Sequence, residues 1–154
     1  MQLSGGAYTI RPSADDHIRV TLSVGASNPS KTGLTIDGKS AKLTVEDTPK
    51  NNFNATIEVP KAADLVLRLS GGDLEMGPIT GNKDIETGGG NVQISVGDPN
   101  DYSSVDASVK AGNLEAGPFG ESKAGLLQNF NWSGHGKYKL HVQLGAGNLE
   151  LQAK

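Results

Sequence analysis

Two pairs of carboxylates in the sequence have a spacing that suits acid–base chemistry. Asp73 and Glu75 are two residues apart, as are Asp84 and Glu86, within runs that alternate between apolar and polar residues. Residues two apart on a strand share a face, and glycosidases use two carboxylates that flank one sugar linkage. Glu75, however, belongs to a short phrase that recurs along the chain, and repetition explains it better than catalysis does. We therefore predict no catalytic residue.

The histidines and acidic residues lack the spacing of metal sites. Asp15, Asp16 and His17 form the densest polar group that contains a histidine, and a turn before the strand-like run 18–24 explains them. No two histidines have a zinc-site spacing, and the absence of cysteine excludes thiolate ligands and disulfides. A row of outward residues could offer carboxylates to Ca²⁺, but calcium-loop signatures are missing and a solvated face is the simpler interpretation. We expect no metal and no cofactor. The residues of that row are Glu75, Gln93, Glu115 and Glu150.

One segment outside the repeats gathers aromatic residues. Residues 130–138 hold three aromatic side chains, including the only tryptophan, together with two glycines. Exposed rings could stack on sugars or hold a partner protein, since Trp and Tyr are favoured contact residues. Buried rings would instead cap the open end of a stack of strands, which is the favoured interpretation. The candidate binding residues are Phe130, Trp132, His135 and Tyr138.

A four-residue phrase recurs in the second half of the chain: a small residue, Gly, Asp or Asn, then Leu or Val. Its copies lie at 71–74, 89–92, 111–114 and 146–149, with degenerate copies at 5–10 and 36–43. Glycine permits positive φ or a close approach of backbones, and Asp or Asn bonds backbone amides at a turn. We predict corners whose Asp and Asn side chains form a polar ladder. The predicted structural residues are Gly72, Asp73, Gly90, Asn91, Gly112, Asn113, Gly147 and Asn148.

The segments between the corners alternate with a period of two residues. Runs such as 53–59, 92–96 and 140–144 place apolar residues on one face, as in a sheet with one buried side. The best helical candidate, 121–129, is interrupted by a glycine. The corner glycines are 18, 22 and 35 residues apart, so the last interval needs an insertion, which 120–137 supplies. These patterns predict an all-β, single-domain β-solenoid or β-prism-like stack of short repeats, with a two-sheet β-sandwich as the alternative.

Composition limits the organisation and the partners. The 154 residues suit one domain, with less regular strands in 1–60 and the repeats in 61–154. A net charge of −3 argues against electrostatic binding to nucleic acid or to an anionic membrane. No stretch approaches the roughly 20 apolar residues of a membrane span, and no signal-peptide core is present, so we expect no membrane insertion by this segment. Loss of a leader or anchor before Met1 is a further hypothesis.

The repeated phrases resemble those of a bacterial family. The motifs are a strand beside Val59-Pro60, "SGGDLEM" at 70–76, "GGGNVQI" at 88–94, "AGNLEAG" at 111–117, the aromatic segment and "GAGNLEL" at 145–151. This combination resembles the putative-adhesin β-strand-repeat domains of unknown function, which are similar to auto-transporter adhesin heads. The likeness extends from about Gly5 to Leu151. It implies a β-solenoid-like fold and an extracytoplasmic or cell-envelope location, and it supplies no catalytic motif.

The expected function is that of a non-enzymatic binding module of the cell envelope or surface. A glycan or an envelope protein is the expected partner, and the oligomeric state stays open. One alternative is a structural or signalling scaffold that self-associates through strand edges. A remoter alternative is a carbohydrate-active enzyme, because β-helices host such sites.

Overall fold

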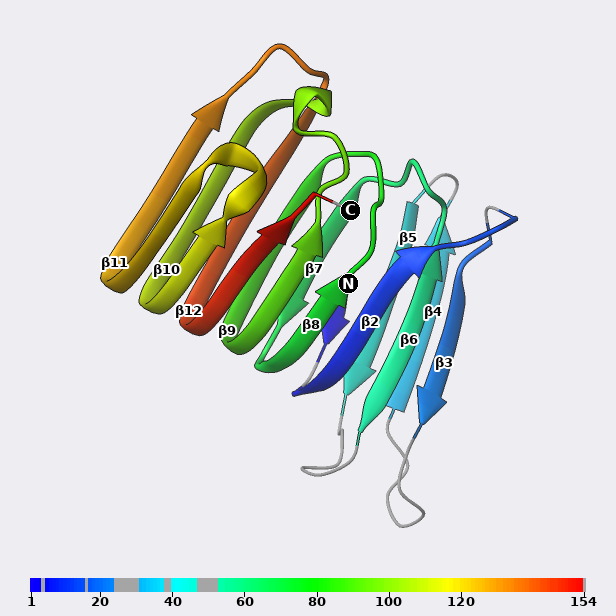
Figure 1. The fold of residues 1–154 in the computed structure, drawn as a ribbon. Helices are drawn as coiled ribbons and strands as arrows, with labels where there is room; N and C mark the ends of the chain where they lie inside the picture. The colour runs from blue at the N-terminus through cyan, green and yellow to red at the C-terminus, as the bar shows by residue number, and fades with distance from the viewer. Residues whose placement is uncertain (4, 16, 24–30, 38–39, 47–52, 154) are drawn as a thin grey trace.

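The computed structural model describes residues 1–3, 5–15, 17–23, 31–37, 40–46 and 53–153 (Figure 1). The all-β prediction is confirmed, because twelve strands form one mixed sheet and the helices described are two 3₁₀ turns. None of these helices is long or apolar enough to span a membrane. The first eight strands are β1 (Gln2–Leu3), β2 (Gly6–Pro12), β3 (Arg19–Ser23), β4 (Lys31–Asp37), β5 (Ser40–Glu46), β6 (Asn54–Val59), β7 (Leu65–Leu69) and β8 (Gly72–Met76).

Four longer strands and the two 3₁₀ turns follow. They are β9 (Lys83–Ser95), η1 (Pro99–Asp101), β10 (Tyr102–Ala116), η2 (Gly117–Phe119), β11 (Glu121–Ser133) and β12 (Tyr138–Gln152). The strand β11 covers 121–129, the helical candidate that a glycine interrupts, so this segment is a strand rather than a helical turn or a loop. Its glycine, Gly125, lies opposite Gly112 of β10. The helical reading failed because the spacing of Ala124, Leu126 and Leu127 fits an exposed, bent edge strand as well as a helical turn.

Most strands stack as coils that bend into two arms at a glycine corner; most of the connection between β5 and β6 lies outside the described residues. We call residues before the corner the first arm (β1, β5, β7, 83–87, 102–109 and 138–144) and residues after it the second arm (β2, β6, β8, 91–95, 113–116 and 148–152). The first arm of β9 pairs in parallel with β7 and β12, and its second arm pairs in parallel with β8 and β12. The strands β1 and β2 continue the stack beside β7 and β8. Figure 1 shows the second arms in front and the corners at the bottom.

The order of coils in the stack differs from their order in the sequence. The C-terminal strand β12 lies between β9 and β10. At the other end, β1 and β2 lie between the coil of β5 and β6 and the coil of β7 and β8. Antiparallel strands close both ends: β11 against β10, and β4 and β3 against β5 and β6. Both chain termini therefore belong to interior strands, near the middle of the molecule (Figure 1).

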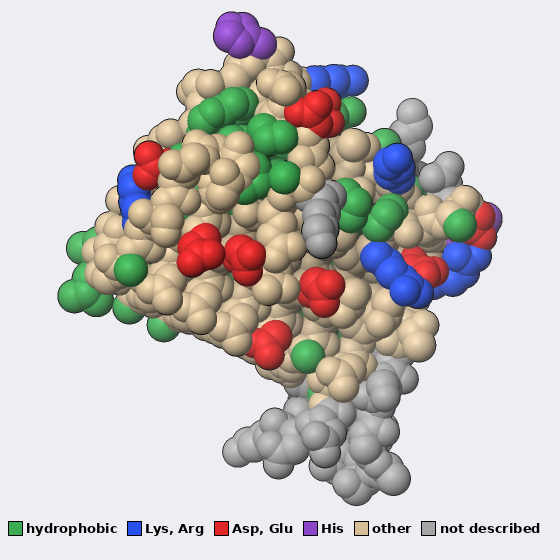
Figure 2. All heavy atoms as spheres, viewed as in Figure 1, with side chains coloured by type: hydrophobic (Ala, Val, Ile, Leu, Met, Phe, Trp, Pro, Cys, Tyr) green, Lys and Arg blue, Asp and Glu red, His purple; other side chains and the backbone are tan. Residues whose placement is uncertain are grey.

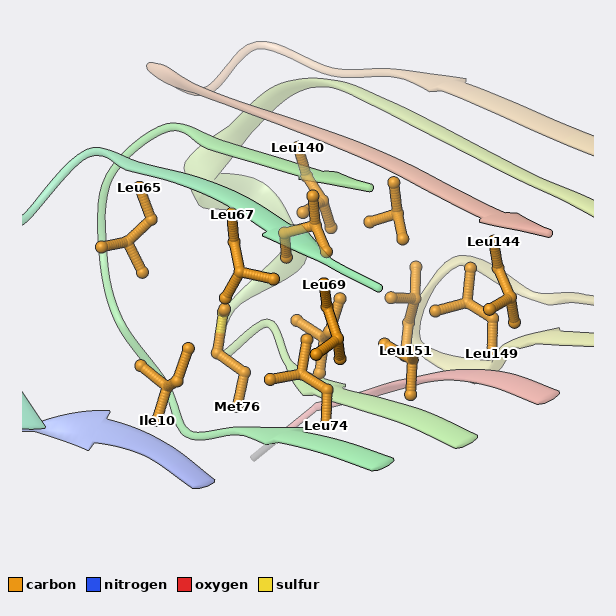
Figure 3. Close-up of a cluster of buried hydrophobic side chains, with 14 of the residues drawn as sticks. Ile10, Leu65, Leu67, Leu69, Leu74, Met76, Leu140, Leu144, Leu149 and Leu151 are labelled. Atoms are coloured by element: carbon orange, nitrogen blue, oxygen red, sulfur yellow. The ribbon is translucent and has the colours of Figure 1, made fainter. Parts of the chain in front are cut away.

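The core lies between the two arms and consists of aliphatic columns. Leu65, Leu67 and Leu69 of the first arm face Ile10, Leu74 and Met76 of the second arm (Figure 3). Each column runs through successive coils in register, and each such side chain contributes about 1.5–3 kcal/mol when fully buried. One column is Leu67, Ile85, Val142 and Ala107, and another is Leu74, Val92, Leu149 and Leu114; all eight are buried.

The corner glycines occupy positions that admit no side chain. Gly72, Gly90, Gly147 and Gly112 have φ between 113° and 137°, and they stack in register. A Cβ on Gly112 would lie 1.8 Å from the carbonyl oxygen of Gly147, and a Cβ on Gly90 would lie 1.9 Å from that of Gly72. The coils can therefore approach each other only through glycine. Gly6 joins this column opposite Gly72, so the copy at 5–10 forms a coil.

The polar ladder predicted from the repeat is present. Asn91 donates to Asp73 Oδ1 (3.1 Å), and Asn148 donates to Asn91 Oδ1 (2.9 Å). Asn113 donates to Asn148 Oδ1 (3.0 Å), so the ladder follows the order of the stack rather than of the sequence. The degenerate copy at 36–43 is different, because β4 and β5 pair there antiparallel, with Ile36 opposite Ala41. That copy is not a parallel corner, and its residues 38 and 39 lie outside the described part.

Candidate binding groove

A groove of about 860 Å³ lies on the outer face of the first arms. One row of outward side chains lines it, running at right angles to the strands and contributed by seven strands in continuous register. At a strand spacing of ~4.8 Å the row is about 29 Å long. The core columns on the inner face hold these strands, so the row is positioned by packing rather than by loops. Its members in order are Thr44, Gln2, Arg68, Glu86, Gln143, Ser108 and Asn129.

The next outward positions form a lower second row. Gly88 and Gly145 stand at its centre and line the groove without side chains. A Cβ on Gly145 would lie 2.3 Å from the carbonyl oxygen of Gly88, and a Cβ on Gly88 would lie 2.3 Å from that of Ser70. The contact between neighbouring backbones therefore keeps this side of the groove open. Lys110 and Leu127 line the end of the groove beside them.

The charged groups at the centre of the groove are paired with one another. Arg68 Nε lies 2.6 Å from Glu86 Oε2, and Arg68 Nη2 lies 3.1 Å from Asp84 Oδ2. The hydrogen bond to Asp84 raises the pKa of Arg68. One guanidinium thus holds both members of a carboxylate pair that the sequence offered for acid–base chemistry. The other pair, Asp73 and Glu75, lies on the second arm, where Asp73 belongs to the ladder.

An unusual backbone conformation lies at the end of the groove. Leu127 has φ of +53°, in the left-handed region that non-glycine residues seldom adopt. Its side chain and that of Leu126 are each 76% exposed, so burial does not offset the cost. Strained residues persist where the surrounding structure imposes them, and they concentrate at functional sites. Leu127 thus combines a left-handed backbone with an exposed side chain at this end of the groove.

The aromatic segment lies away from the groove, at the β11 end of the core. Phe130 is buried, and Trp132 packs on Phe119 with ring centroids 4.9 Å apart. Tyr138 is partly buried against the core, whereas His135 is exposed in the loop that follows β11. The structure thus brings Phe130 and Trp132 together through Phe119 and leaves His135 apart. This arrangement matches the capping interpretation of the segment.

The acidic row of the second arms forms a solvated face. Figure 2 shows acidic side chains scattered among uncharged ones on this side of the molecule. Glu75, Gln93, Glu150 and Glu115 follow one another in register, and Gln93 donates to Glu150 Oε2 (3.2 Å). Within the described residues no three His, Asp or Glu side chains are grouped so as to hold a metal ion.

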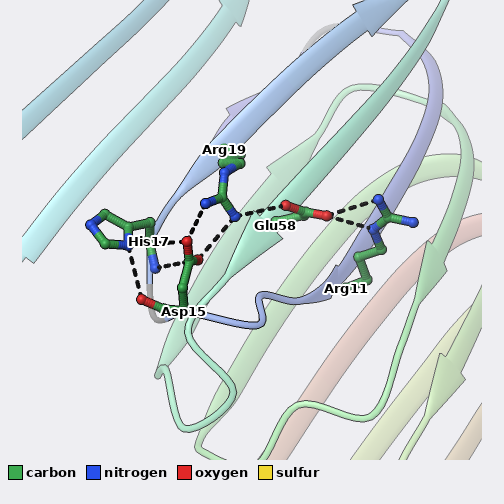
Figure 4. A network of polar contacts seen from close by, with 5 residues as sticks. All are labelled: Arg11, Asp15, His17, Arg19 and Glu58. Carbon is green, nitrogen blue, oxygen red and sulfur yellow. Dashed lines mark hydrogen bonds and ion pairs between the residues drawn. The ribbon is translucent and has the colours of Figure 1, made fainter.

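A surface network joins the turn at Asp15 to the strands β2, β3 and β6 (Figure 4). Glu58 accepts from Arg11 Nη2 (2.8 Å) and Arg19 Nη1 (3.3 Å), and Arg19 also pairs with Asp15. Hydrogen bonds from Arg11 and Arg19 lower the pKa of Glu58, and the hydrogen bond from Arg19 lowers that of Asp15. His17 bonds the backbone oxygen of Asp15 through Nδ1 (2.9 Å). These contacts fit the predicted turn, although Asp16 itself lies outside the described residues.

Sequence reasoning missed a buried amine. Lys83 is 2% exposed, and its Nζ donates to Tyr102 Oη (3.0 Å) and to the carbonyl oxygen of Gly81 (3.2 Å). Burial lowers the pKa of Lys83 to about 8, against the opposing influence of Asp64, and burial raises that of Tyr102 to about 12. The period-two pattern could have revealed its burial, because Lys83 lies two residues before the inward-facing Ile85 and therefore on the same face of the strand. Its packing marks it as part of the core, not of the groove.

Comparison with known proteins supports the fold. No family model and no curated protein matches the sequence. The chain is similar to a crystal structure described as a putative cell adhesion protein from Clostridium sporogenes ATCC 15579, with a TM-score of 0.60 and 14% identity. The likeness covers 99% of this chain and 91% of that chain. At this identity the likeness concerns the fold alone, and it extends over nearly the whole stack of coils.

Proposed function

We propose that the protein is a non-enzymatic, adhesin-like binding module of the cell envelope or cell surface, and that the groove on its first arms is the binding surface. The observation that carries the proposal is the row of seven polar side chains in continuous register. The similar structure is described as a putative cell adhesion protein, and this description supports the same role.

The row has the properties of a surface built for contact rather than for bond cleavage. Its side chains stand on strands whose inner faces are packed, so the backbone that carries them is already ordered and little backbone entropy is lost on binding. Its only carboxylate, Glu86, is paired with Arg68. A ligand lying along the row would meet many weak hydrogen bonds in sequence, which suits reversible attachment to an extended surface polymer.

Binding to cell envelopes tests the proposal. Labelled protein is mixed with isolated bacterial envelopes, and bound protein is measured after sedimentation over a range of concentrations. The double variant Gln143→Ala/Asn129→Ala should weaken saturable binding at least tenfold. The control Gln93→Ala removes the same kind of exposed side chain from the outer face of the second arms, and it should bind like the wild type.

Two results would contradict the proposal. One is the absence of saturable binding to any envelope preparation. The other is equal loss of binding in the groove variant and in Gln93→Ala, because the groove would then have no special part.

A further inference from the structure

We infer that the groove binds a linear, uncharged polysaccharide that lies across the strands. This inference rests on the proposed function and names the class of its ligand. The argument has four parts: the direction of the row, its hydrogen-bonding chemistry, its charge and its apolar end.

The direction of the row excludes recognition by strand addition. A peptide that binds by β-augmentation needs the free main-chain groups of a sheet edge. The groove lies on a face of the sheet, where each of the strands β7, β9, β12 and β10 is paired with a neighbouring strand on both sides. Its occupant must therefore be read by side chains, one strand at a time.

The chemistry of the row matches hydroxyl groups. Gln2, Gln143 and Asn129 each carry both a donor and an acceptor in one plane, and Ser108 supplies a hydroxyl. A sugar hydroxyl also donates and accepts hydrogen bonds, so these side chains can act as its donor or as its acceptor. The row repeats every ~4.8 Å, which is close to the length of one pyranose in an extended chain, so about six sugars could each meet one strand.

The charge of the groove favours an uncharged polymer. Arg68 is engaged by Glu86 and Asp84, which leaves Lys110 as the cation of the lining that has no carboxylate partner among the described residues. A polyanion gains most from a cleft lined by one sign of charge. One free cation along a row of seven strands does not provide such a lining.

The apolar end of the groove supplies the remaining contact. Sugar rings present C–H groups as well as hydroxyls, and these need an apolar surface. Leu127 lies at the end of the groove, exposed and held in a strained conformation. Retention of a strained, exposed leucine is explained if its side chain packs on a bound ring.

Titration calorimetry with defined oligosaccharides tests the inference. The probes are cellohexaose, chitohexaose and laminarihexaose as uncharged chains, and hexagalacturonate as an anionic chain. At least one uncharged hexamer should bind, more tightly than its dimer and with little dependence on salt. Gln143→Ala and Leu127→Ala should each weaken that binding at least fivefold, whereas Gln93→Ala should not. Thermal melting confirms that every variant is folded, and chromatography of the mixtures should show no cleavage.

The outcomes separate the ligand class from the proposed function. Failure of all uncharged hexamers at millimolar concentration, with groove-dependent envelope binding intact, overturns the polysaccharide and leaves the binding module. Salt-sensitive binding of hexagalacturonate alone overturns the uncharged class. Binding that Gln93→Ala weakens as much as Gln143→Ala overturns the groove as the site. Cleavage of any probe overturns the non-enzymatic role itself.

Discussion

At the residue scale, the glycines of the repeated phrase are determined by their neighbours in adjacent coils. The carbonyl oxygen of one corner occupies the space that a Cβ on the next corner would need. Positive φ adds a second reason, because other residues adopt this region only at a cost. The Asp or Asn that follows then finds its partner in the ladder. The phrase therefore encodes a structural contact rather than a reaction.

Substitution of a corner glycine tests this role. Gly112→Val should destabilise the protein by about 3 kcal/mol or more, because it combines a backbone clash with unfavourable φ. Gly33→Val is the matched control, since Gly33 also lies in a strand and a Cβ there meets nothing within 4 Å. Chemical denaturation measures both variants. A Gly112→Val protein with unchanged stability would refute the close-approach explanation.

At the same scale, the buried Lys83 leads to a prediction about how the stability of the protein depends on pH. Its pKa of about 8 in the folded protein lies below the ordinary 10.5, so the unfolded chain binds more protons between these values. Stability should therefore rise as the pH increases from about 8 towards 10. Below pH 8 both states carry the charge, and the cost of burying it, about 3 kcal/mol at most, is fully present.

The variant Lys83→Met should be more stable than the wild type at pH 7, and it should lose the rise above pH 8. Measurements are best confined below pH 10, because the raised pKa of Tyr102 makes stability fall once unfolded tyrosine ionises. Lys139 is exposed, so Lys139→Met serves as the control and should change neither the stability at pH 7 nor its rise above pH 8. If Lys83→Met kept the alkaline rise, another group would be its source.

At the element scale, the edge strand β11 is protected against pairing with another chain. Lys123 Nζ donates to the carbonyl oxygen of Asn129 (2.7 Å), and Gln128 Nε2 donates to those of Ala124 and Leu126 (3.1 Å each). The left-handed Leu127 also interrupts the straight course of the strand. Natural sheets use charges and irregularities in this way to prevent edge-to-edge association. These contacts argue against the alternative role as a scaffold that self-associates through strand edges.

We therefore expect a monomer, and we expect Lys123→Ala/Gln128→Ala to associate more than the wild type does. Light scattering coupled to size-exclusion chromatography measures both proteins over a range of concentrations. The control Lys61→Ala/Gln93→Ala removes the same residue types away from β11 and should stay monomeric. A wild-type dimer that the β11 variant disrupts would favour the scaffold instead.

At the scale of the whole molecule, the order of the coils depends on which strands tolerate two neighbours. The inner positions of β12 are apolar throughout, including Leu149 and Leu151, so β12 can lie between two coils. In β11, Lys123 and Glu121 lie opposite Leu114 and Ala116, where an interior strand would need apolar side chains. The strand β11 is therefore restricted to the edge, and the aromatic cluster of Phe119, Phe130 and Trp132 covers the core beside it.

The sequence by itself determined the strands, the corners and the inward columns, because these depend on local features: a period of two, glycine next to Asp or Asn, and repetition. It also indicated that residues 120–137 interrupt the regular spacing. The local pattern of Asn113 and Asn148 is the same, however, so nothing near them reveals that β12 enters between β9 and β10.

Tertiary structure alone decided the groove. Arg68, Glu86, Gln143 and Ser108 are recognisable from the sequence as outward residues, but each looks like an ordinary solvated side chain. They become one row only when distant strands pair in register, and the row lies beside Leu127 only because β11 folds back on β10. Register between distant strands is a property of the assembled sheet, since a shift of one residue turns every side chain to the other face.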